Sequence, residues 1–268
     1  MKTQAQLYKY HCANRGRIES AIKRISLNLR RAVASEDRHT IKAFLPLYGL
    51  LIGASAEASL QKILCEPTPF TIGRREHVLE SSTHLERWKR LVDAAFRTHF
   101  GLNEKTPLDK NTIPLQEFAI YTELVDLLDH ELRIIIEIRN KLAHGQWEYP
   151  LNEDCTDVLP EKKKLLDREN LVSLELKHSI IDNLLKIIRD LSVSHRTVVR
   201  DFPLFYRRIQ NARCRLTTVS YDKYKLVLVA RRKRGLKKRT DAYRTILGAS
   251  PGMGFLNSLM HKSPASKE

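Results

Sequence analysis

The stretch LVDLLDHELRIIIEIRNKLAH, residues 124–144, is the most hydrophobic helical segment of the chain and decides its fold class. We expect it to form the second half of a helix that begins near Pro114. Gly145 follows directly, and glycine is the usual residue just past a helix C-terminus. Helical spacing of apolar residues dominates the rest of the chain too, so the sequence predicts an all-α fold.

The sequence predicts four further helices. The first covers residues 4–34, and the second starts at a Ser35 or Asp37 cap and runs to about Cys65. The third covers 76–100 and the fourth 171–200. The proline-rich segment 66–73 interrupts the chain. Residues 146–169 are polar and contain Pro150 and Pro160, so we expect a long exposed loop there.

We expect these helices to divide the chain into a helical bundle and a C-terminal extension. Residues 1–200 form a helical bundle with an extra N-terminal helix, 1–34, packed on it, and residues 201–268 form a basic C-terminal extension that ends in a loose tail. From residue 196 to residue 239 the sequence holds 15 Lys or Arg and 2 acidic residues. The periodicity of YDKYKLVLVA, 221–230, fits a strand and a helix equally well.

The charge balance indicates the kind of partner. Lys and Arg number 47 against 31 Asp and Glu, a formal net charge of +16. Such an excess favours a polyanion, either nucleic acid or an anionic membrane surface, although a basic surface can also serve solubility alone.

Several classes of protein are disfavoured. The four cysteines are scattered, with no CxxC pair, which argues against a disulfide framework or a zinc site and favours reduced thiols in the cytoplasm. The polar N-terminus lacks the apolar core of a secretory signal. The longest uncharged run, residues 43–56, is shorter than the roughly 20 residues that cross a bilayer, so we expect a buried core helix and no membrane association.

The long central helix ends in IEIRNKLAHGQW, 136–147, in which Arg139 and Asn140 are followed after three residues by His144. This arrangement resembles the HEPN superfamily, whose hallmark is Arg, a polar residue, and His near the end of an inner helix of a bundle. The resemblance covers residues 36–200 and implies a ribonuclease of the kind found in host defence and toxin–antitoxin pairs. It implies a homodimer with both motifs in one cleft, and an antitoxin or other regulatory partner. Gln146 stands where members paired with nucleotidyltransferase antitoxins often carry Tyr.

Helix geometry limits how the motif can work. Five residues of a continuous helix turn through about 140°, so Arg139 and His144 of one chain point apart. They converge if the helix ends between them or if a second subunit supplies one of the two groups.

The residue types suit RNA cleavage without metal or cofactor, because RNA carries its own nucleophile, the 2′-hydroxyl. We expect His144 to be the general acid or base, Arg139 the phosphate clamp, and Asn140 the positioning group. Glu57, the only charge in an apolar stretch, could pair with Arg139 inside the bundle, or it could reach the surface or pair with another residue. His144 also has a non-catalytic alternative, in which it only complements the helix dipole at a helix C-terminus.

The basic segment predicts RNA binding beside nearby tyrosines. Its candidate residues are Arg231, Arg232, Lys233, Arg234, Lys237, Lys238 and Arg239. Two other readings stay open. The chain could be a non-catalytic RNA-binding or adaptor protein with the same fold, or a structural partner whose basic tail docks on an acidic protein.

Overall fold

The computed structural model describes residues 2–67 and 70–246, and within them the chain is all-α, as the sequence predicts. The only strand-like feature in these ranges is an isolated bridge between Leu151 and Val158. The elements are α1 (Gln4–Ser35), α2 (Arg38–Leu64), α3 (Ile72–Leu79), α4 (His84–Phe100), α5 (Leu115–Leu127), a π-helical turn η1 (Leu128–Leu132), α6 (Arg133–Ala143), α7 (Pro160–Asp167), α8 (Leu171–Val193), α9 (His195–Thr218) and α10 (Tyr221–Ile246).

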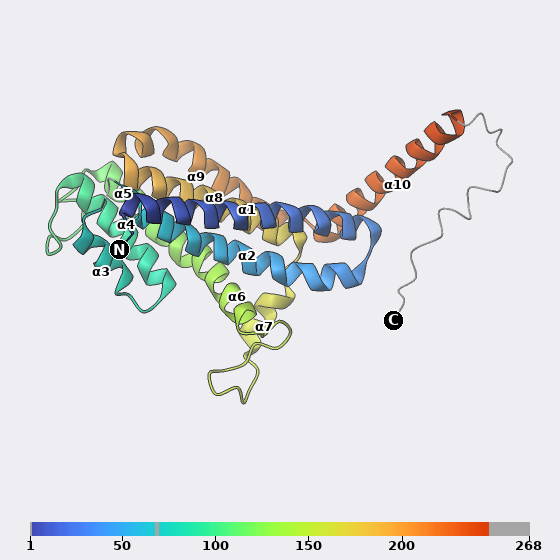
Figure 1. Cartoon of the computed structure of the whole chain (residues 1–268), viewed down its shortest axis with the longest axis horizontal. Helices are drawn as coiled ribbons and strands as arrows, with labels where there is room; N and C mark the ends of the chain where they lie inside the picture. Colours follow the sequence, from blue (N-terminus) through green and yellow to red (C-terminus); the bar gives the residue numbers. More distant parts are fainter. Residues whose placement is uncertain (1, 68–69, 247–268) are drawn as a thin grey trace.

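The helices form one bundle with an arm (Figure 1). α1 lies along α2, α2 packs on α6 and α8, and α8 packs on α9. The helices α3, α4 and α5 gather at one end of the bundle, whereas α10 leaves the opposite end and extends beyond it. A single cluster of buried apolar side chains links these helices, with Trp88, Tyr48 and Phe96 among its largest members.

Short polar side chains begin the helices by accepting the first free backbone N–H groups. Asp37 caps α2 by accepting from the Thr40 amide at 3.0 Å, in agreement with one of the two predicted caps. Ser35, the other candidate, is the last residue of α1. Asn170 caps α8 in a reciprocal arrangement with Ser173.

Two predictions of local structure were wrong. The segment 76–100 is not one helix, because Thr83 accepts from the Glu86 amide at 3.2 Å and thereby starts α4 as a new helix after α3. Residues 146–169 are not entirely loop, because α7 forms within them. Pro160 occupies the first turn of α7, where its missing N–H removes no hydrogen bond.

In the described part of the C-terminal third, the chain is helical except for the short links at Ser194 and at residues 219–220. α8 ends at Val193, seven residues before the predicted end at 200, and the predicted boundary between bundle and extension falls inside α9. Ile209 and Ala212 of α9 are buried in the same core as the preceding helices. Residues 221–230, for which strand and helix were equally compatible with the sequence, belong to α10. The predicted loose tail lies mostly outside the described residues.

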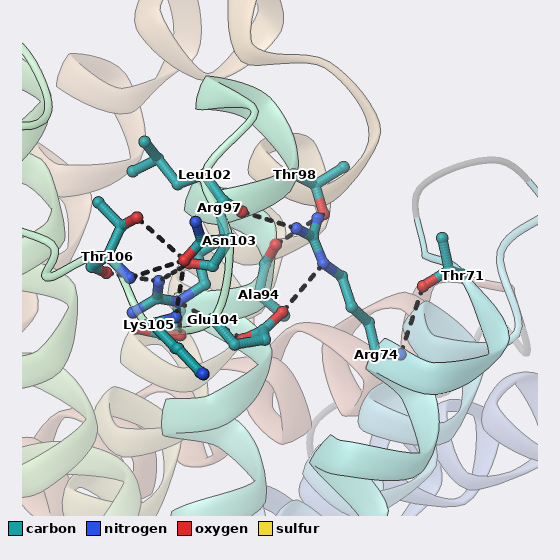
Figure 2. A network of polar contacts seen from close by, with 11 residues as sticks. Thr71, Arg74, Ala94, Arg97, Thr98, Leu102, Asn103, Glu104, Lys105 and Thr106 are labelled. Carbon is teal, nitrogen blue, oxygen red and sulfur yellow. Dashed lines mark hydrogen bonds and ion pairs between the residues drawn. The ribbon is translucent and has the colours of Figure 1, made fainter.

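A buried arginine ties the loop after α4 to the helices around it (Figure 2). Arg97, with 9% of its side chain exposed, pairs with Asp93 at 2.5 Å and donates to the Thr106 carbonyl at 2.7 Å. Its NH1 also donates to the Asn103 carbonyl, and Arg74 of α3 donates to the Leu102 carbonyl at 3.0 Å. These bonds fix three carbonyl groups of the loop to side chains of α3 and α4.

The predicted core helix is α2. Tyr48, Ile52, Ala56 and Leu60 are almost completely buried along it. By length and composition alone α2 could also cross a bilayer, and 44% of its most apolar window is buried in the bundle. That resemblance is weak support for membrane insertion, because core helices of water-soluble proteins share it.

Candidate active site

Arg139 of α6 packs directly against α2 at Gly53. Gly49, Gly53 and Glu57 are spaced four residues apart and therefore share one face of α2. A Cβ added to Gly53 would lie 2.4 Å from the Cβ of Arg139, and one added to Gly49 would lie 3.2 Å from Ile138 Cγ2. Glycine at position 53 thus lets the Arg139 stem rest directly on the α2 backbone.

The guanidinium of Arg139 is held at two points. Nη2 lies 2.5 Å from Glu57 Oε2, and Nη1 donates to Asn140 Oδ1 at 3.0 Å. The side chains of Arg139 and Glu57 are 25% and 20% exposed, so the pair is shielded from water but reachable from one side. The structure thereby brings together three of the residues singled out from the sequence.

His84 completes this cluster and was missed in the sequence. Its Nε2 lies 3.4 Å from Glu57 Oε1, so Glu57 bridges a histidine of α4 and an arginine of α6. His84 is the first residue of α4, directly after the Thr83 cap. The cap signal at Thr83 and Glu86 could have located this helix start, but nothing in the sequence relates it to Glu57.

A groove of about 550 Å³ opens beside Glu57 and His84. Its polar lining comes from α1, α2 and α4: His11, Asn14, Arg17, Glu57, Gln61 and His84. The groove therefore offers both hydrogen-bond donors and titratable groups next to the Arg139 cluster.

His144 stands at the C-terminus of α6, as predicted. Gly145 adopts the left-handed conformation, with φ of 75°. The Gln146 amide donates to the Lys141 carbonyl at 3.0 Å and the Gly145 amide to the Leu142 carbonyl at 3.2 Å, which is the Schellman pattern of helix termination. The His144 side chain is exposed and makes no hydrogen bond or ion pair with any described residue.

Arg139 and His144 are not brought together within one chain. α6 stays helical through Ala143, and the His144 amide still donates to the Asn140 carbonyl at 3.2 Å. The helix therefore does not end between the two residues, and its geometry keeps their side chains about 140° apart. The structure therefore does not show the first of the two arrangements that the sequence allowed, in which the helix ends between Arg139 and His144.

The basic candidates of α10 are all exposed, but they do not share one face. Arg231, Arg232 and Arg239 face α1 and line a hollow between the two helices. The others, Lys233, Arg234, Lys237 and Lys238, are not part of that lining.

Within the described residues no group of three His, Cys, Asp or Glu side chains is placed to hold a metal ion. All four cysteines are free, and Cys155 and Cys214 are exposed.

Comparison with known proteins does not assign the chain to a family. No protein-family model matches the chain, and neither the curated proteins nor the solved structures contain a significant match.

Proposed function

We propose that the protein is a metal-independent endoribonuclease of HEPN type that acts as a homodimer. The observation that supports the proposal is how the guanidinium of Arg139 is held. Glu57 and Asn140 hold its guanidinium, at the start of an Arg-Asn-x3-His motif whose histidine is exposed at the end of the same helix. A fixed guanidinium can bind a phosphate and an exposed imidazole can transfer protons, which are the two roles that this kind of phosphodiester cleavage assigns to them.

The reaction needs no group beyond the substrate and these side chains. The 2′-hydroxyl loses its proton to a base and its oxygen bonds to phosphorus. The bond from phosphorus to the 5′-oxygen breaks, and an acid protonates that oxygen. The products are a 2′,3′-cyclic phosphate and a 5′-hydroxyl. Arg139 would bind the nonbridging phosphate oxygens, whose negative charge grows in the transition state.

A homodimer would resolve the geometry of the motif. Two copies of α6 meeting across a symmetry axis would bring Arg139 of one chain towards His144 of the other. The dimer would also supply two copies of His144, one neutral and able to take the 2′-proton, the other protonated and able to give a proton. Asn140 would keep Arg139 in register, and Glu57 would act on the substrate only through Arg139.

The test is cleavage of total RNA in EDTA by wild type, His144→Asn and Arg139→Lys, followed by chemical mapping of the new ends. We expect cyclic-phosphate and 5′-hydroxyl ends from wild type and a loss of at least about a hundredfold in either variant. His39→Asn is the matched control, because His39 is an exposed histidine at the start of α2, outside the cluster. Full activity of His144→Asn would refute the assignment.

One observation favours a second candidate, a non-catalytic RNA-binding or adaptor protein. Arg139 is three-quarters buried and already bonded to two side chains, which a purely structural ion pair would also show. RNA binding without new ends in EDTA, together with equal unfolding midpoints for wild type and His144→Asn, would favour that candidate. A role in host defence or as a toxin and a regulatory antitoxin follow from the family resemblance, and a cytoplasmic location follows from the scattered cysteines; all of them are part of this proposal.

A further inference from the structure

Two adjoining hollows lie on a face formed by α1, α8, α9 and α10, on elements that contribute nothing to the Arg139 cluster. Their volumes are about 510 and 460 Å³, and both are lined by Arg30 and Arg231, so they form one continuous groove. Among the described residues one carboxylate, Glu175, lines it together with seven arginines: Arg30, Arg31, Arg208, Arg215, Arg231, Arg232 and Arg239. No lysine belongs to the described lining.

Most of this positive charge is not neutralised. Arg30 pairs with Glu175 at 2.6 Å. Arg208 lies over the ring of Phe205, and Arg232 reaches the Arg31 carbonyl at 3.5 Å. Across residues 2–67 and 70–246, none of the groove arginines other than Arg30 has a carboxylate partner. The groove therefore concentrates cationic donors whose counterpart is missing from the described part of the chain.

The chemistry of the lining selects a phosphate polymer. Guanidinium groups bind phosphate oxygens through two parallel N–H bonds, whereas lysines act as point charges. A groove that spans four helices suits a chain that carries many phosphates at regular intervals better than one isolated anion. Asn211 and Tyr224, which also line the groove, carry further hydrogen-bonding groups beside the arginines.

We infer that this arginine groove, and not the basic run of α10 as a whole, binds the phosphate backbone of RNA. The identification of RNA rests on the proposed function, whereas the need for a polyanion does not. More than half of the arginines, Arg30, Arg31, Arg208 and Arg215, come from the bundle, which the basic run in the sequence did not reveal. Lys233, Arg234, Lys237 and Lys238 lie outside the lining and contribute only to the general field.

The experiment compares two pairs of substitutions that remove the same charge from the same helices. Arg208→Gln with Arg231→Gln takes two charges out of the groove, and Arg207→Gln with Arg234→Gln changes exposed neighbours outside it. Both pairs are built into full-length His144→Asn, so that RNA is not consumed. Binding of a fluorescent single-stranded oligoribonucleotide of about 16 nucleotides is then titrated at several salt concentrations.

The groove pair should lower affinity about tenfold near 0.15 M salt and reduce the slope of log affinity against log salt by about 1.4, since each phosphate contact contributes about 0.7. The control pair should change affinity less than about twofold. Equal losses in both pairs, with unchanged unfolding midpoints, would overturn the inference. So would unchanged RNA binding by the groove pair together with lost binding to vesicles rich in phosphatidylserine, which would make the ligand a lipid surface. Cleavage by wild type is assayed separately, so an inactive protein with intact groove binding would refute only the proposed function.

Discussion

The close contact between α2 and α6 can be tested by adding one methyl group. In Gly53→Ala the new Cβ would sit 2.4 Å from Arg139 Cβ and 2.7 Å from Arg139 Cγ. Carbon atoms in ordinary contact are about 3.5–4.0 Å apart, so α2 and α6 must separate by roughly 1 Å at this point. Neither atom belongs to the far end of the Arg139 side chain, so a change of rotamer offers little relief.

The magnitude follows from two opposing effects. Overpacking of this kind costs about 1–3 kcal/mol, whereas replacing a helical glycine with alanine gains up to about 1 kcal/mol from backbone entropy. A Cβ added to Gly16 of α1 would meet no atom within 4 Å, so Gly16→Ala measures the helix gain alone. The difference between the two variants therefore isolates the overpacking, about 1–3 kcal/mol in favour of Gly16→Ala.

Urea unfolding followed by circular dichroism measures both variants. Gly49→Ala should fall between them, because its Cβ would lie 3.2 Å from a methyl at the end of Ile138, which can move. Cleavage by folded Gly53→Ala should drop by up to about a hundredfold, since roughly 1 Å of displacement moves Arg139 out of register. If Gly53→Ala proved as stable as Gly16→Ala, the reasoning about this helix contact would be refuted.

Two further predictions concern stability. Arg97→Met should destabilise the fold by about 3 kcal/mol, because it leaves the Asp93 carboxylate and two loop carbonyls without their arginine partner. The control is Arg90→Met, which loses a single exposed hydrogen bond and should cost less than about 1 kcal/mol. Thermal unfolding measures both variants. Burial lowers the pKa of His178 in the folded protein. Just below pH 6.5 the unfolded chain therefore binds more protons than the folded one, and the free energy of unfolding should fall as the pH drops through that region. The expected loss is about 1.4 kcal/mol for each unit by which the pKa is lowered. This loss of stability at acidic pH should be smaller in His178→Gln than in wild type. If both proteins showed the same dependence of stability on pH, the effect could not come from burial of His178.

Local signals account for the parts of the fold that were predicted correctly. The capped starts and apolar spacing of α1, α2 and α8 are encoded within each segment, and so is the glycine that ends α6. These predictions succeeded because one segment carries both the signal and its consequence. The pairing of Glu57 with Arg139 is different: it joins two distant helices and was only one of the arrangements that the sequence allowed for this lone carboxylate.

The features that were missed depend on segments distant in the chain. His84 reaches Glu57 only because α3 and α4 are separate helices that fold back on the bundle. The arginine groove joins α1 to α9 and α10, and single arginines such as Arg30 and Arg215 carry no mark in the sequence that relates them. The π-helical turn η1 inserts an extra residue before α6, and no residue type in Leu128–Leu132 specifies it.

The position of Arg139 bears on whether the motif is functional. α2 keeps Gly53 opposite this residue, and a close approach of that kind would pack an apolar side chain on α6 equally well. Replacing a buried ion pair by apolar side chains is often neutral or stabilising by about 1–4 kcal/mol, so the pair of Arg139 with Glu57 is a poor device for stability alone. The place of Arg139 against the α2 backbone, little more than one turn from the exposed His144, is therefore one reason for our proposal that it binds a phosphodiester.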